Sequence, residues 1–176
     1  MYSKVTWIQK AKYIYKFPLS ICDKSKLAKN YPMNLRDLIE SKKGEKMNIT
    51  QKDMKILLKS QQGELDVVLM YRALADTVKD ANDQETFRKL ATEEGHHASV
   101  FHNLTKENLK PKKTKAIFIP LLYKIIGKKK LYKLIANGEY NAANTYAPVA
   151  EKFPEIESVK NDEKRHGDIV SSLLKV

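Results

Sequence analysis

Four segments of the chain carry apolar residues at alternating three- and four-residue steps, the spacing of an amphipathic helix. The first predicted helix spans residues 50 to about 79, and a short polar turn separates it from a second, from about 83 to 109. A third is expected from about 128 to 153. The fourth spans 154 to about 174 and begins with Pro154, which suits the first turn of a helix. The chain is therefore predicted to be all-α.

The two helix pairs are separated by a connection of roughly 18 residues, over 110–127. Pro111, Pro120 and Gly127 interrupt the helical pattern there. A single long connection in the middle of four helices is the arrangement of ferritin-like bundles. The predicted fold is a ferritin-like four-helix bundle with one long crossover between helices two and three.

Polar residues that can bind metal ions or transfer protons interrupt the inner face of every predicted helix. The first helix carries Glu64 and, seven residues later, Tyr71, and the second carries Glu94 followed by His97. The corresponding residues of the third and fourth helices are Glu139, Tyr146, Glu163 and His166. The two halves of the bundle therefore form an approximate two-fold internal repeat.

The glutamates and histidines of this repeat fall near the middle of their helices, so an antiparallel bundle would bring them to one level. Four buried carboxylates would repel one another and resist ionisation. Two divalent cations would neutralise the four charges, and Glu-x-x-His places both ligands on one helix face. Oxygen and nitrogen donors in this number suit two iron ions, or manganese. The predicted metal ligands are Glu64, Glu94, His97, Glu139, Glu163 and His166.

Helical phase distinguishes the ligand histidine from its neighbours. Glu93 and His96 have the same spacing as the chosen Glu-x-x-His pair but lie one step off the inner face. We expect them beside the ligands or on the surface. The residue three positions before His102 is Ser99 and not a glutamate, so His102 is expected to be a surface or core histidine.

We predict roles for four further residues near the predicted site. Gly95 weakens a helix interior by about 1 kcal/mol, so it would permit close approach of a neighbouring helix or a local irregularity. Gln61, one turn before Glu64, is a candidate hydrogen-bond partner of the ligands. Tyr71 and Tyr146 are candidate catalytic residues that would hydrogen-bond ligand carboxylates or donate to bound peroxide.

Three ordered motifs carry a resemblance to a known family. They are "EEGHHA" at 93–98, "GEYNAANTY" at 138–146 and "DEKRHGD" at 162–168. With Glu64 before them, they resemble rubrerythrin and its relatives among the ferritin-like di-iron proteins. The resemblance covers about residues 50–175.

The resemblance implies a role for each ligand and also exposes two departures. The implied roles are terminal ligation by Glu64 and Glu139, bridging of two irons by Glu94 and Glu163, and completion of one iron each by His97 and His166. The chain has Ala142 where rubrerythrins have a further carboxylate. With Cys22 as its only cysteine, it also lacks their usual Cys-rich rubredoxin domain. Electrons are expected from a separate donor, such as a rubredoxin-like protein.

These features favour a small cytoplasmic di-iron oxidoreductase that reduces hydrogen peroxide, most simply as a homodimer. A pair of Fe(II) ions can deliver two electrons together, which splitting an O–O bond requires. One alternative is a ferroxidase or iron-storage protein that uses dioxygen and assembles into a large hollow oligomer. Another is a di-iron hydroxylase that works at a membrane surface.

Charge and composition modify this picture locally. The net charge is +12, and residues 110–133 hold nine lysines and no acid. That segment could contact anionic lipid, although a solvated basic connector is the commoner outcome; no nucleic-acid partner is predicted. No apolar run reaches the roughly 18 residues of a membrane span. Lysines also interrupt the N-terminal apolar residues where a secretory signal needs an unbroken run.

Residues 1–46 match nothing in the predicted bundle, which is expected over 47–176. They hold eleven Lys/Arg against four Asp/Glu, with the only Trp and the only Cys of the chain. The sequence "KKGEK" before Met47 back-translates to a purine run that resembles a bacterial ribosome-binding site. Residues 1–46 are thus either a translated leader ahead of a start at Met47 or a genuine basic extension that packs on the bundle or a partner.

Overall fold

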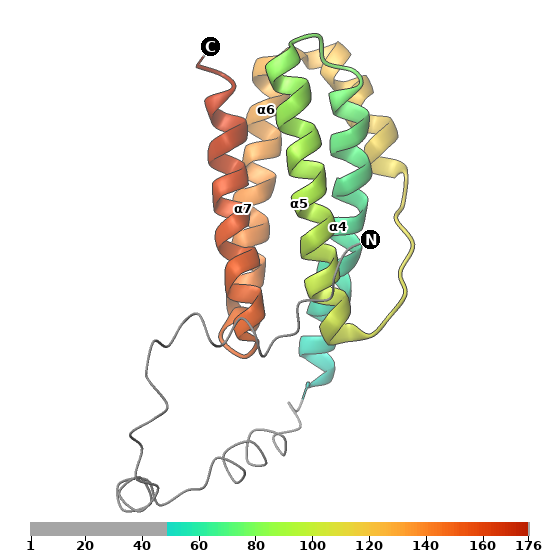
Figure 1. The fold of residues 1–176 in the computed structure, drawn as a ribbon, viewed down its shortest axis with the longest axis vertical. Helices are drawn as coiled ribbons and strands as arrows, with labels where there is room; N and C mark the ends of the chain where they lie inside the picture. Colours follow the sequence, from blue (N-terminus) through green and yellow to red (C-terminus); the bar gives the residue numbers. More distant parts are fainter. Residues whose placement is uncertain (1–48, 176) are drawn as a thin grey trace, which may run out of the picture. The chain divides into compact units, whose positions relative to one another are not determined.

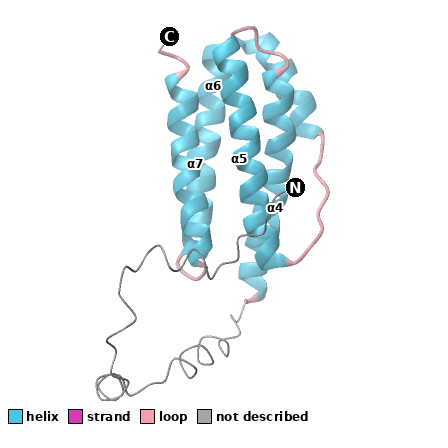
Figure 2. Cartoon of the chain, in the orientation of Figure 1, coloured by secondary structure: helices cyan, strands magenta, loops and turns pink. Residues whose placement is uncertain are grey.

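A computed structural model describes residues 49–175, and the leader or extension predicted over 1–46 lies outside them. Four helices, and no strand, make up the described part of the chain (Figures 1 and 2). They are α4 (Gln51–Ala75), α5 (Ala81–Thr105), α6 (Thr114–Ala150) and α7 (Pro154–Ser172). The all-α, ferritin-like four-helix prediction is confirmed.

Local sequence explains where the helices begin. The Thr50 side chain accepts a hydrogen bond from the backbone N–H of Asp53, and the Asp53 carboxylate accepts one from the Thr50 backbone, which completes a capping box on α4. The Asp80 side chain caps α5 by accepting a hydrogen bond from the N–H of Asp83. The first helical residue of α7 is Pro154, as expected.

The helices pack as two sequential pairs that lie against each other. The neighbouring pairs are α4 with α5, α6 with α7, α4 with α6 and α5 with α7. Short turns at 76–80 and 151–153 make each sequential pair antiparallel. Figure 1 shows the crossover running from the end of α5 along the side of the bundle before α6 begins.

The crossover differs from the prediction because most of it is helical. Only residues 106–113 are irregular, and α6 begins at Thr114, fourteen residues before the expected start. Gly127 has φ 77° and ψ 170°, a conformation that only glycine adopts readily, and it joins two helical halves of α6 at a kink. Ile119, Leu122, Tyr123 and Ile126 from the first half pack on the bundle core, whereas other apolar residues of this half remain exposed.

Two apolar clusters fill the bundle on either side of a polar layer. One contains Leu74, Phe87 and Leu131, and the other contains Leu57, Phe101 and Ile156. Each large apolar side chain buried in this way stabilises the fold by about 1.5–3 kcal/mol. The three- and four-residue steps also predict Val68 and Ala142 on the inner faces, and these two are only half-buried. The other residues predicted on those faces are buried.

No helix within residues 49–175 has a stretch that is both long and apolar enough to cross a lipid bilayer.

Candidate metal centre

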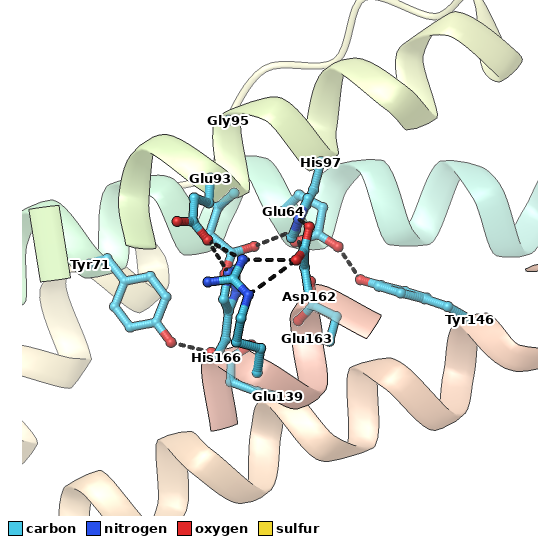
Figure 3. A network of polar contacts seen from close by, with 12 residues as sticks. Glu64, Tyr71, Glu93, Gly95, His97, Glu139, Tyr146, Asp162, Glu163 and His166 are labelled. Atoms are coloured by element: carbon cyan, nitrogen blue, oxygen red, sulfur yellow. Dashed lines mark hydrogen bonds and ion pairs between the residues drawn. The ribbon is translucent and has the colours of Figure 1, made fainter. Parts of the chain in front are cut away.

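The structure brings the six predicted ligands into the interior of the bundle, between the two apolar clusters. Glu64 and Glu139 come from α4 and α6, Glu94 and His97 from α5, and the remaining pair from α7 (Figure 3). Each is buried, with exposed fractions between 0% and 6%. The three- and seven-residue spacings therefore place these side chains inside, as the helical phase predicted.

Four of the six form a tight cluster. Donor atoms of Glu94, His97, Glu163 and His166 all lie within 4.8 Å of one another. His97 Nδ1 lies 2.9 Å from Glu163 Oε1, and His166 Nδ1 lies 2.9 Å from Glu94 Oε1. The two imidazole rings face each other nearly in parallel, with centroids 5.2 Å apart. The donor atoms of this four-donor cluster are close enough to one another to hold a metal ion.

Several buried atoms of the cluster lack a hydrogen-bond partner among the described residues. They are Glu94 Oε2, His97 Nδ1 and both carboxylate oxygens of Glu163. His97 Nδ1 and Glu163 Oε1 lie 2.9 Å apart, yet no hydrogen bond joins them. Buried polar atoms are almost always satisfied in folded proteins. Unpaired oxygens and a nitrogen that converge on one point fit a cation such as iron or manganese.

The two outer glutamates are held by tyrosines from the opposite helix. Tyr71 of α4 donates a hydrogen bond to Glu139 of α6, and Tyr146 of α6 donates one to Glu64 of α4. The predicted hydrogen bonds between these tyrosines and ligand carboxylates are thus present. Because each tyrosine serves the glutamate of the other half, the arrangement has the approximate two-fold symmetry of the repeat.

A second reciprocal arrangement orients the histidines. His166 Nε2 lies 2.7 Å from Glu93 Oε2, and His97 Nε2 lies 3.4 Å from Asp162 Oδ2. Arg165 bridges these two acids, with Nη2 2.7 Å from Glu93 and 2.8 Å from Asp162. An imidazole whose Nε2–H donates to a carboxylate on the side away from the centre presents Nδ1 to a metal. Glu93 and Asp162 would therefore hold Nδ1 of each imidazole toward a bound metal.

The close contacts in the cluster shift the pKa values of its carboxylate and imidazole groups, and the histidines favour their protonated form when no cation is bound. Burial alone would raise the pKa of Glu94, but the adjacent His166 and His97 outweigh it and lower the pKa to about 2. Burial alone would lower the pKa of His97, but the Glu163 and Glu94 carboxylates raise it to about 10. The pKa of His166 is raised for the same reason, chiefly by Glu94. The His97 imidazole is therefore cationic at neutral pH, and the environment of His166 also favours the protonated form.

The outer glutamates are shifted in the opposite direction to Glu94. Burial first, and then the charges of Glu94 and Glu163, raise the pKa of Glu64 and of Glu139 well above the ordinary value. A divalent cation would remove the cause of these shifts by balancing the buried negative charge. The carboxylates and imidazoles thus fit a metal chemically as well as geometrically.

The structure separates the neighbouring histidines as the helical phase predicted. His96 is exposed, and His102 is half-buried with Nδ1 3.0 Å from the Glu107 carbonyl oxygen. Neither contacts the four-donor cluster.

Two other expectations are wrong. Gln61 does not bond a ligand: its amide donates to the Glu107 carbonyl and its oxygen accepts from Thr105 at the end of α5. Gly95 marks neither a close contact nor an irregularity. It lies in regular helix, and a Cβ there would have Val68 Cγ2 as its nearest neighbour, at 4.0 Å.

Arg165 is the contributor that the sequence patterns did not single out. It lies on the exposed side of α7, off the inner face, where a charged residue has no distinctive signal. Its proximity to two acids, Asp162 three residues before it and Glu93 on α5, is a tertiary feature.

A four-helix bundle with one crossover and a buried layer of glutamates and histidines defines a ferritin-like protein with a candidate metal centre. The family model described as Rubrerythrin matches residues 55–174, so the chain belongs to the rubrerythrin family, part of the ferritin-like superfamily. No curated protein and no solved structure gives a significant match to the chain. Family membership makes the buried cluster compatible with a di-iron site.

Proposed function

We propose that this protein is a di-iron oxidoreductase that reduces hydrogen peroxide to water. The single observation that supports it most is the buried layer in which four carboxylates and two imidazoles meet between apolar clusters. Membership of the rubrerythrin family supports it independently.

The proposed ligands are the six residues of that layer. In this arrangement Glu94, His97, Glu163 and His166 would hold the ions from α5 and α7, and Glu64 and Glu139 would complete the set from α4 and α6. Two reduced iron ions would supply together the two electrons that cleavage of the O–O bond requires. Hydrogen peroxide then takes up two electrons and two protons and leaves as two molecules of water.

The surrounding residues have positioning roles in this proposal. Tyr71 and Tyr146 hold the carboxylates of Glu139 and Glu64 in place, and their hydroxyls are candidates for donating a proton to peroxide. Burial, followed by the charge of Glu139, raises the pKa of the Tyr71 hydroxyl well above its ordinary value, so it stays protonated and able to donate. Electrons reach the site from a separate redox protein, for which a rubredoxin-like partner is the proposal.

A stoichiometric oxidation experiment tests the proposed reaction. Protein loaded anaerobically with Fe(II) is mixed with hydrogen peroxide or with dioxygen, and loss of Fe(II) is followed by stopped-flow absorbance. We expect one peroxide to oxidise two Fe(II) per chain, faster than an equal concentration of dioxygen does. Faster reaction with dioxygen, together with uptake of many irons per chain, would mean iron handling and would contradict the proposal.

A further inference from the structure

A cavity leads from the protein surface to the candidate metal centre between α4 and α6. Its volume is about 390 Å³, and its inner wall includes Glu64, Glu139 and Glu163. These three are at most 6% exposed, so they form the closed end. One water molecule accounts for only about 30 Å³ in the liquid, and hydrogen peroxide is of similar size. The cavity is therefore far larger than a path for hydrogen peroxide needs to be.

The side walls of this cavity are mainly apolar. Val67, Met70, Ile119 and Ile135 contribute side chains from both helices. Ala142 also lines the cavity and presents only a methyl group, which leaves room one helical turn from Glu139. Pockets of roughly 300–1,000 Å³ with apolar walls and few polar groups are typical of sites for organic molecules.

Two lysines give the cavity an electrostatic preference. Lys59 of α4 and Lys115 of α6 both line it, and both are exposed, so they lie toward the solvent end. The lysines that form ion pairs within residues 49–175 are other ones, at 89, 128, 152 and 160. The arrangement is cationic at the mouth, apolar along the walls and polar at the closed end. It complements an apolar chain with an anionic head.

From this complementarity we propose that the cavity binds fatty-acid hydroperoxides and that they are substrates of the same centre. The inference rests on the proposed function, because it takes the reaction as peroxide reduction. In that reaction the O–O bond of the hydroperoxide would break, with two electrons supplied by the separate redox protein by way of the iron ions that the six residues would hold, and two protons supplied by solvent. One oxygen leaves as water and the other stays on the chain as an alcohol, so atoms and electrons balance.

Binding of an unreactive probe tests the cavity independently of turnover. Decanoate is titrated into the full-length protein as purified, with its metal content unchanged, by isothermal calorimetry. We expect saturable binding at one site per chain. Ala142→Phe should weaken it by about tenfold or more, because the ring takes the place of several methylene groups.

Reversing charge at the mouth provides a second variant with a matched control. Lys115→Glu should weaken decanoate binding several-fold, and the difference should shrink in high salt. Lys124→Glu makes the same charge change on the same helix, at an exposed position that does not line the cavity, and should bind like wild type. Equal losses in both lysine variants would overturn the proposal, because they would indicate attraction to the overall positive charge.

The activity measurement separates this inference from the proposed function. Iron-loaded protein is assayed with hydrogen peroxide and with a fatty-acid hydroperoxide, and Ala142→Phe should lower the second rate relative to the first. Turnover of hydrogen peroxide without saturable decanoate binding would overturn the inference alone. Decanoate binding without reduction of either peroxide would overturn the proposed function, and the substrate assignment with it. A second copy of the chain seated on the cavity, seen as a dimer that excludes decanoate, would also overturn it.

Discussion

At the scale of single residues, the candidate centre depends on which nitrogen of each histidine faces inward. His97 directs Nδ1 toward Glu163 and Nε2 toward Asp162. His166 directs Nδ1 toward Glu94 and Nε2 toward Glu93. Glu163 and Glu94 are the inner glutamates of the site, and Asp162 and Glu93 are its outer acids. This division follows from the sequence, since each outer acid directly precedes the inner glutamate of its own helix. An acid on one helix thereby orients the histidine of the facing helix.

Substitution of the histidines tests the ligand assignment. His97→Ala and His166→Ala should each lower the metal content by about one ion per chain, because each removes a donor from the four-donor cluster. His96→Ala, on the exposed side of the same helix as His97, is the matched control and should keep full metal content. Metal per chain is measured by plasma emission after gel filtration. Equal losses for His96→Ala and His97→Ala would mean that the helical phase is off by one.

Proton release on metal binding tests the electrostatics. The carboxylates of Glu163 and Glu94 raise the pKa of His97 to about 10 against the opposing effect of burial. Below that pH the imidazole holds a proton, which must leave before Nδ1 can bind a cation. Metal affinity should therefore rise with pH between about 6 and 9. Calorimetry in two buffers of different ionisation enthalpy measures the released protons, and a buffer-independent enthalpy would contradict this account.

Much of the site was predictable from single residues because three separate signals coincide: helical phase, mid-helix position and the repeat. The role of Gln61 was not predictable, because its position one turn before Glu64 is equally compatible with hydrogen bonds to the end of α5. The partners it takes, Thr105 and Glu107, depend on where α5 terminates. Sequence spacing within one helix carries no information about that.

At the scale of secondary-structure elements, the decisive feature is the kink at Gly127. Pro120 and Gly127 are helix-breaking signals in the sequence, so the predicted third helix starts fourteen residues later than α6 does. One positive-φ glycine redirects the chain without ending helical structure on either side. Local sequence signals mark such a residue as an interruption but do not show that helix resumes before it.

A pair of glycine substitutions tests the kink. Gly127→Ala should destabilise the protein by about 1–3 kcal/mol, because its φ of 77° and ψ of 170° suit only glycine. Gly95→Ala should instead stabilise the metal-free protein by about 0.5–1 kcal/mol, since that glycine lies in regular helix with no neighbour closer than 4.0 Å to a new Cβ. Urea unfolding measures both. Stabilisation by Gly127→Ala would show that the kink is not there.

A tyrosine pair tests how α6 is fixed to α5. Tyr132 Oη donates to the buried Asp83 carboxylate at 2.7 Å, and Lys128 binds the same carboxylate at 2.9 Å. Tyr132→Phe should destabilise the protein by about 1.5–3 kcal/mol, because it removes a bond to a buried charged group. The control is Tyr140→Phe, which loses an exposed bond to Asp168 and should change stability by less than about 1 kcal/mol. Equal effects in thermal unfolding would contradict the role of Asp83 as a buried anchor.

At the scale of the whole molecule, the bundle consists of two apolar clusters separated by a layer of buried charge. Such a layer opposes folding unless a compensating charge is present, because four carboxylates repel one another at low dielectric. In the metal-free protein the raised pKa values of His97, Glu64 and Glu139 favour their protonated forms, which reduces that repulsion. Metal ions would compensate it more completely and would connect all four helices through one set of ligands.

The central claim is that this layer is a two-metal site, and metal stoichiometry measured together with thermal stability tests it most directly. Purified protein is analysed for bound metal by native mass spectrometry, and its melting temperature is recorded before and after exhaustive chelation. The account predicts two ions per chain and a clear fall in melting temperature when they are removed, reversed by adding Fe(II) or Mn(II). Protein that binds no stoichiometric metal and melts at the same temperature with and without these ions would contradict it.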